Sequence, residues 1–200
     1  MKIISKLDRK RMGIETYREE MRLLQQLDHS HVIQLIEYFE TKTDIYIVLE
    51  YCKCDLSIYL KRKGGYLKVE EVRVIALQLI NGLYYLHKMS WFTMISSYLM
   101  PWWVQITEAD FWLLGVVLYE LYVGKTPFRT TSLADLKHNI MEEDIIWPRE
   151  IPNEFKHFLQ GLLKRDPVER MTWSQLKRYP FLLSLDTEEN SLRSSTSTLS

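Results

Sequence analysis

The sequence has 200 residues, of which 46% are hydrophobic, so it can bury a substantial core in one domain or two small lobes. Lys plus Arg and Asp plus Glu each number 26, and the formal charge of zero excludes a broad basic field for nucleic acid or anionic lipid. Cys52 and Cys54 are too few and too close for a disulfide framework, so we expect the reducing environment of the cytoplasm. No Cys/His set in the sequence predicts a zinc site.

The most apolar stretch of the chain predicts a buried helix. It runs from Phe111 to Val123, which is shorter than the roughly 20 residues that a membrane-spanning helix needs. The N-terminus also lacks the long apolar region of a signal peptide. Neither secretion nor insertion into a membrane is therefore expected.

The first fifty residues predict a helix followed by two strands. Apolar residues recur at helical spacing from Thr16 to Leu27, with Thr16 available as the N-cap. Two β-rich runs follow, Val32–Phe39 and Ile45–Tyr51, and the polar segment between them is typical of a hairpin. This part of the chain is therefore expected to combine a helix with a small sheet.

After Asp55 the pattern becomes helical. An apolar stripe predicts a helix from about Val69 to His87. Further helices are expected at four places: after a cap at Asp110 with Gly124 just past the end, after Ser132, along Phe155 to Leu163, and from Thr172 with Gln175 until Pro180. From Asp186 onward the chain is polar and is expected to be disordered. These patterns predict an α+β chain with two unequal lobes.

Five segments, in collinear order, resemble those of eukaryotic serine/threonine protein kinases. They correspond to the lysine-bearing strand, the helix and strand that follow it, the strand entering the hinge, the central helix of the large lobe and the arginine-bearing segment near the end: Met1–Lys6, Glu19–Leu35, Ile45–Cys52, Ala109–Phe128 and Leu162–Trp173. Within this family, Ile145–Pro148 followed by Phe155–Leu163 most resembles the Fused-like kinases, neighbours of the unc-51-like group.

This resemblance implies a two-lobed protein-kinase-like fold with an incomplete small β-lobe and a mainly helical large lobe. Residues 1–54 would be a remnant of the small lobe and hinge, and residues 55–185 would form the large lobe without its catalytic loop and most of its activation segment. Residues 186–200 would be a disordered Ser/Thr-rich tail.

The resemblance also implies ATP and Mg²⁺ as cofactors and assigns candidate binding residues. Lys2 stands where the family grips the phosphates, and Glu20 where it pairs with that lysine. Leu49 would be the gatekeeper, while Glu50 and Cys52 would belong to the hinge that holds adenine. The alternative interpretation is that Lys2 and Glu20 are solvated surface residues.

The sequence departs from the family where phosphoryl transfer is carried out. No glycine-rich loop precedes Lys2 in this sequence, and no His-Arg-Asp or Asp-Phe-Gly motif follows His87. Between His87 and Glu108 there is no Asp, Glu or Asn, so this stretch supplies neither a general base nor a ligand for Mg²⁺. We therefore assign no catalytic residue.

The activation segment also departs from the family. Trp102 stands where the family has a glutamate that pairs with the arginine corresponding to Arg170. An unpaired buried charge costs about 3 to 5 kcal/mol, so we expect this region to loosen or to let Arg170 reach water.

Three functions remain open from the sequence. The chain is a Ser/Thr kinase that binds ATP, an inactive pseudokinase-like scaffold that binds protein partners through its helical lobe, or a truncated splice form or gene model without independent function. The uncharged segment Met89–Val104, rich in aromatic residues, fits either an apolar partner-binding patch or read-through of sequence never selected as protein. Protein partners are expected, and the oligomeric state stays open.

Overall fold

A computed structural model describes residues 2–5, 14–96, 108–128, 140, 142–148 and 150–183, with the backbone alone for 14–17, 19–20, 90–96 and 108–109. The chain divides into two compact units. The sheet unit comprises Met1–Asp55 and Asn81–Gln105, and the helical unit comprises Leu56–Ile80 and Ile106–Ser200. Each unit is described below by itself.

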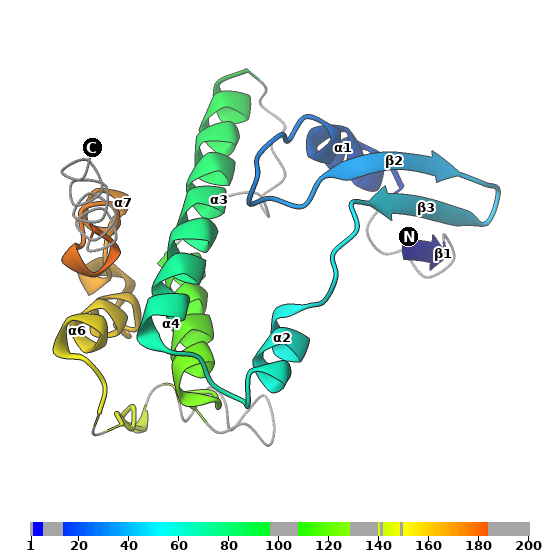
Figure 1. Cartoon of the computed structure of the whole chain (residues 1–200). Helices are drawn as coiled ribbons and strands as arrows, with labels where there is room; N and C mark the ends of the chain where they lie inside the picture. The colour runs from blue at the N-terminus through cyan, green and yellow to red at the C-terminus, as the bar shows by residue number, and fades with distance from the viewer. Residues whose placement is uncertain are drawn as a thin grey trace, which may run out of the picture. The chain divides into compact units, whose positions relative to one another are not determined.

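The sheet unit contains an antiparallel sheet of three strands in the order β1-β3-β2 (Figure 1). The strands are β1 (Lys2–Ser5), β2 (Leu35–Glu40) and β3 (Asp44–Leu49). Ile4 lies opposite Ile45 in the β1–β3 register, and Tyr38 lies opposite Ile47 in the β2–β3 register. Because side chains alternate along a strand, Ile4, Ile45 and Ile47 all face one side of the sheet, where they are buried.

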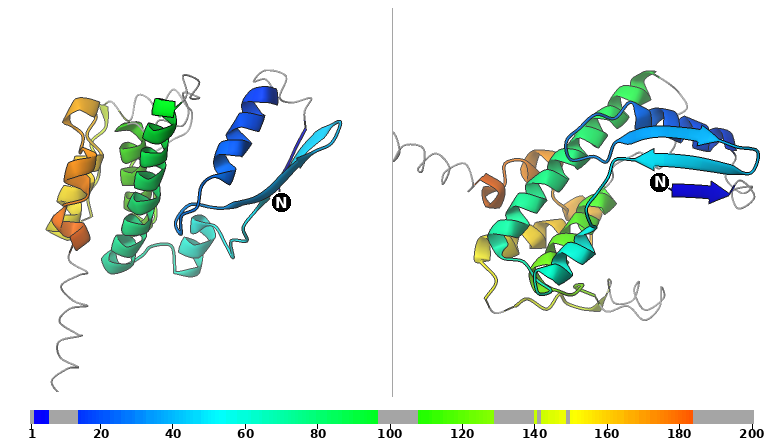
Figure 2. Two further views of the ribbon diagram at one scale, coloured as in Figure 1. Left: turned by 90° about the horizontal axis from the view of Figure 1, so that it is seen from above. Right: turned by 45° about the vertical axis from the view of Figure 1, so that its right-hand side comes forward.

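Helix α1 (Ile14–Gln25) lies against the sheet on the side of these isoleucines, as Figure 2 shows. Its Met21 is buried in the same cluster as Ile4 and Ile47. The Arg18 guanidinium of α1 also forms a two-pronged ion pair with Glu40 at the end of β2, with Nε–Oε1 at 2.8 Å and Nη2–Oε2 at 3.0 Å. Apolar burial and this ion pair together fix α1 on the sheet.

The helix and strands of this unit are confirmed, but their boundaries differ from the predicted ones. β2 begins at Leu35 rather than Val32, because the Val32 amide donates to the His29 carbonyl (3.0 Å) in a turn. β3 ends at Leu49, and Tyr51 beyond it is 87% exposed.

The helical unit is built around α4 (Glu108–Val123). Leu114, Leu118 and Leu121 of this helix are almost completely buried. A helix that is apolar on nearly all sides must be covered on nearly all sides. Two helices help to cover it: α6 (Asn153–Leu162), which packs directly on α4, and α7 (Trp173–Leu176), whose Trp173 ring meets Phe111 edge-on at 4.7 Å.

Two glycines shape α4. A Cβ atom at Gly115 would lie 2.9 Å from Leu163 Cγ and 3.0 Å from Leu162 Cβ, so α4 and α6 approach closely only because this position has no side chain. Gly124 has a φ of +81° and its amide donates to the Glu120 carbonyl (2.7 Å), which ends the helix as predicted.

Two more helices precede α4 in the chain, α2 (Leu56–Arg62) and α3 (Val69–Ser96). Val72, Ala76 and Ile80 of α3 are buried in the helical unit. The prediction that α3 ends near His87 is wrong, because the helix continues to Ser96. The chain contains no Gly or Pro between His87 and Ser96, so no residue in this stretch breaks the helical hydrogen-bond pattern.

Three features near the predicted caps can be compared with the structure. Asp110 is the third residue of α4 rather than its N-cap, since Glu108 and Ala109, good helix formers, already belong to the helix. The capping box of Thr172 with Gln175 is confirmed at α7. Pro180 does not end that helix, which stops at Leu176; it begins a separate helical turn over residues 180–183. The helix expected after Ser132 and the tail from residue 186 lie outside the described residues.

Substitution of Gly115 tests the close contact between α4 and α6. We expect Gly115→Leu to lower the free energy of unfolding by about 1 to 3 kcal/mol, because the added side chain overpacks against Leu162 and Leu163. Thermal unfolding followed by circular dichroism measures the change. Leu113→Phe adds bulk on the same helix at a side chain that is 54% exposed, and it should leave the melting temperature nearly unchanged. Equal effects of the two variants would contradict the close contact.

Candidate functional site

The backbone places Lys2 on the face of the sheet that α1 covers. Lys2 lies opposite Ile47 in the β1–β3 register, and it shares a face with Ile4, which packs with Met21 of α1. Glu20 is the residue before Met21 in that helix. The Lys2 side chain is exposed, and the Glu20 side chain lies outside what the structure describes, so their ion pair stays a prediction.

The hinge candidates follow the end of β3. Leu49 is partly buried against the cluster of the sheet unit, whereas Glu50 and Cys52 are exposed. The Glu50 amide donates to the Gln34 carbonyl (3.0 Å), and the Glu50 carboxylate accepts from the Gln34 amide (2.9 Å). Glu50 therefore joins the end of β3 to the segment before β2, and a role of Glu50 or Cys52 in holding adenine stays a prediction.

The described residues do not fit a Mg²⁺–ATP site. Phosphoryl transfer needs carboxylate or amide oxygens for Mg²⁺ and a carboxylate near the attacking hydroxyl. Burial holds the pKa of His87 below its ordinary value. After His87 the backbone continues as helix α3 to Ser96, and the sequence of this stretch contains no carboxylate and no Asn side chain. Within the described ranges, no three His, Cys, Asp or Glu side chains gather as metal ligands. Within the described residues, no donor set of the kind that the family uses is present.

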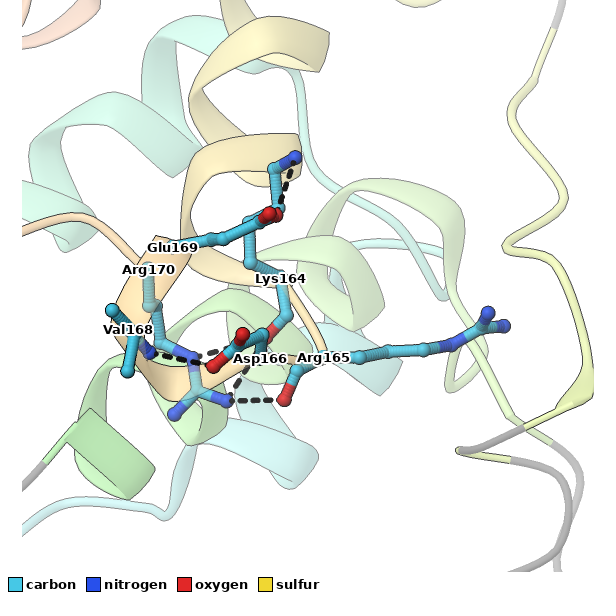
Figure 3. Close-up of polar contacts among 6 residues, drawn as sticks. All are labelled: Lys164, Arg165, Asp166, Val168, Glu169 and Arg170. Atoms are coloured by element: carbon cyan, nitrogen blue, oxygen red, sulfur yellow. Dashed lines mark hydrogen bonds and ion pairs between the residues drawn. The ribbon is translucent and has the colours of Figure 1, made fainter.

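Arg170 is buried and hydrogen-bonded, contrary to the expectation that it would loosen or reach water. It is 8% exposed, and its Nε and Nη2 atoms donate to the Lys164 carbonyl at 3.1 and 2.9 Å (Figure 3). Nη2 also donates to the Arg165 carbonyl at 3.4 Å. The guanidinium therefore caps the carbonyl groups of the turn after α6. These hydrogen bonds replace part of the hydration that the guanidinium loses on burial.

The turn held by Arg170 leads into a short 3₁₀ helix, η2 (Pro167–Glu169). The Asp166 carboxylate accepts from the Val168 amide (2.9 Å) and Pro167 occupies the first helical position, a pairing that favours a helix start. Lys164 and Glu169 form an exposed ion pair at 3.3 Å, visible in Figure 3. This turn presents Asp166, Val168 and Glu169 at the surface.

The segment 142–148 is attached to the helical core by two residues that the sequence interpretation did not single out. Arg165 donates through Nε to the Ile140 carbonyl (2.9 Å) and through Nη2 to the Glu143 carbonyl. The Tyr119 hydroxyl donates to the Ile146 carbonyl (2.5 Å), and burial raises the pKa of Tyr119. Backbone acceptors carry no sequence signal, so these contacts could not be found from residue patterns.

Segment 142–148, Phe128 and the end of α6 with the following turn enclose an open groove of about 860 Å³. Its lining combines apolar side chains with charged ones: Phe128, Ile145, Trp147 and Leu163, with Asp144, Gln160, Lys164, Arg165, Asp166 and Glu169. All of these residues belong to the helical unit.

Comparison with known sequences shows the family. The profile of the family described as "Protein kinase domain" matches residues 1–95 and 96–182. The chain therefore belongs to the protein kinase family, and its fold is an incomplete two-lobed kinase fold with a three-stranded antiparallel sheet and mainly helical remaining elements.

Curated relatives confirm the resemblance to Fused-like serine/threonine kinases. The mouse "Serine/threonine-protein kinase 36" and the Drosophila melanogaster "Serine/threonine-protein kinase fused" are both 31% identical over 91% of this chain. The Arabidopsis thaliana "Serine/threonine-protein kinase TIO" is 30% identical over the same share. The chain spans 17%, 28% and 17% of the length of these three relatives, respectively.

Replacement of Arg170 tests its role in the turn. Arg170→Ala should lower the free energy of unfolding by about 2 to 3 kcal/mol, because buried carbonyl groups lose a charged donor. Arg170→Lys should rescue little of this, since an ammonium lacks the planar fork of donors. As a matched control, Lys164→Met breaks only an exposed ion pair and should cost less than about 1 kcal/mol in chemical denaturation. A harmless Arg170→Ala would refute the role.

Alkaline titration tests the Tyr119 hydroxyl. Its folded-state pKa lies above the ordinary unfolded value of about 10, so its stabilising contribution is complete below pH 10 and is lost as pH rises through the folded pKa. Tyr119→Phe should therefore melt below the wild type at pH 8, and the gap should narrow above pH 10. Tyr122 and Tyr179, whose pKa values burial also raises, remain in both proteins. A gap that stays constant from pH 8 to 11 would contradict this assignment.

Proposed function

We propose that this chain is a protein-binding member of the serine/threonine kinase family that does not itself transfer phosphate. The observation that carries the proposal is the stretch between His87 and Glu108, which contains no Asp, Glu or Asn. Without a carboxylate base or metal ligands from this stretch, the positioning and charge stabilisation that drive phosphoryl transfer have no source there.

The alignments with relatives support an internal loss at this place. The alignment with the mouse relative extends over 224 positions, whereas 91% of this chain is about 182 residues, so about 40 positions of that relative have no counterpart here. The family profile also matches in two segments that meet between Ile95 and Ser96. Both findings are as expected if the catalytic loop and most of the activation segment are missing, while the helices before and after them remain.

The packing of the helical unit supports an independent fold rather than a fragment without structure. Phe155, Phe158 and Leu159 of α6 are completely buried, and Tyr122 meets Phe155 edge-on at 5.3 Å.

The proposal keeps the division into a small-lobe remnant (1–54), a large lobe (55–185) and a tail (186–200), with a cytoplasmic location. Within the described residues, no helix has the length and apolar character needed to cross a membrane.

An active, ATP-binding kinase is the second candidate. One observation favours it: Lys2 lies on the face of the sheet that α1 covers, which is where the family holds its phosphate-binding lysine. A transcript that encodes a His-Arg-Asp motif between Lys88 and Asp110 would mean that another form of the protein is an active kinase. The proposed inactivity would then apply only to the form described here.

Nucleotide binding separates the two candidates. A ligand at 100 times its Kd stabilises the folded state by about 2.7 kcal/mol, so a bound nucleotide raises the melting temperature measurably. We expect millimolar Mg²⁺–ATP to give no shift beyond Mg²⁺ alone and no radiolabel transfer to a Ser/Thr peptide library. Lys2→Met should behave as the wild type. Transfer above background would refute the proposal, whereas an ATP-dependent shift that disappears in Lys2→Met would contradict only the expected loss of nucleotide binding.

A further inference from the structure

The groove of the helical unit, defined by the lining residues Phe128, Asp144, Ile145, Trp147, Gln160, Leu163, Lys164, Arg165, Asp166 and Glu169, has an apolar floor. Phe128 and Leu163 are buried, and the Trp147 ring meets Tyr119 edge-on at 5.8 Å. With about 860 Å³, the groove lies within the size range of protein ligand sites and has room for several side chains of a peptide.

Two exposed aliphatic side chains neighbour the lining residues of this groove. Ile146 is 78% exposed and stands between Ile145 and Trp147 in the chain. Val168 is 92% exposed and stands between the lining residues Asp166 and Glu169 on η2. Both sit on backbone that is fixed, by the Tyr119 hydroxyl and by the Asp166 carboxylate respectively. Both residues are chain neighbours of groove-lining residues, and exposed aliphatic side chains of this kind add to the apolar surface available to a partner.

The charge around the groove is predominantly acidic. The Asp144 carboxylate is completely exposed, and Glu142 and Glu143 precede it as exposed residues. Asp166 and Glu169, in the turn after α6, also line the groove. The nearby cations are already engaged. Lys164 pairs with Glu169, Arg165 donates to the carbonyls of residues 140 and 143, and the Lys156 ammonium lies 5.8 Å from the Trp147 ring.

We propose that this groove binds a basic segment of a partner protein. An aliphatic or aromatic side chain of that segment enters the apolar floor, and Lys or Arg residues beside it meet the carboxylates of Glu143, Asp144 and Asp166. Asp144 also pairs with Arg165 (3.8 Å), but the carboxylates of Glu142, Glu143, Asp144, Asp166 and Glu169 outnumber the cations of Lys156, Lys164 and Arg165. This excess of acidic groups favours a basic occupant over an acidic one. This inference rests on the proposed protein-binding function and names the surface and the partner chemistry.

The test uses the full chain and fluorescent synthetic peptides of equal length. The first peptide combines Leu and Trp with Arg, the second replaces every Arg by Glu, and the third keeps Arg but replaces Leu and Trp by Ser. Fluorescence anisotropy should show binding of the first peptide, at least about tenfold tighter than either of the others, and the Kd should weaken as salt is raised.

Variants of exposed residues locate the binding site without disturbing the core. Ile146→Ser with Val168→Ser should weaken binding about tenfold through the loss of apolar contact, and Glu143→Gln with Asp144→Asn should weaken it several-fold and flatten the salt dependence. Leu183→Ser and Glu70→Gln are matched controls, since both residues are exposed in the helical unit and lie outside segment 142–148 and the turn after α6 that frame the groove. Neither control should change the Kd.

The other outcomes overturn the inference. Binding that survives the groove variants places the partner elsewhere, and equal or absent binding of the three peptides rejects a basic occupant. Self-association in sedimentation velocity that Val168→Ser abolishes, without peptide binding, assigns the groove to a second copy of this chain. Radiolabel transfer to the Ser/Thr peptide library would refute the proposed inactivity but leave the peptide-binding result readable, so the two failures are distinguishable.

Discussion

The helical unit depends on the burial of one helix, α4, which has almost no polar face. Leu118 is completely buried, and α6 reaches α4 closely because Gly115 has no side chain to separate them. The Leu67 amide donates to the Leu121 carbonyl (2.8 Å), which joins the segment before α3 to the same helix. A helix that is apolar all round can exist in water only inside such a shell, so its burial requires its neighbours to be in place.

This dependence explains how a chain without Asp, Glu or Asn between His87 and Glu108 can keep the helical core of the kinase fold. The residues that hold phosphate, metal and proton in this family occupy loops, whereas the core contacts come from helices that lie on either side of the lost segment. The described contact between α4 and α6 involves Gly115, Leu162 and Leu163, all of which lie outside the stretch between His87 and Glu108.

The turn after α6 shows how a charged side chain can be accommodated inside the helical unit. Arg170 remains buried by donating to carbonyl groups of Lys164 and Arg165, so the backbone keeps a shape that the sequence interpretation expected to loosen. The same turn displays Asp166 and Val168 beside the groove. By holding this turn, Arg170 helps to determine which charged and apolar groups the surface offers.

Much of the fold and family could be predicted from the sequence, because local patterns carry that information. The apolar run before Gly124 and the Thr172 cap with Gln175 predicted helix positions, and the collinear motifs predicted the family. The absence of Asp, Glu and Asn between His87 and Glu108 is also a property of the sequence. Only the tertiary structure decided the carbonyl partners of Arg170 and the attachment of segment 142–148 by Tyr119, since backbone carbonyls are identical in every residue and their pairing depends on which surfaces meet.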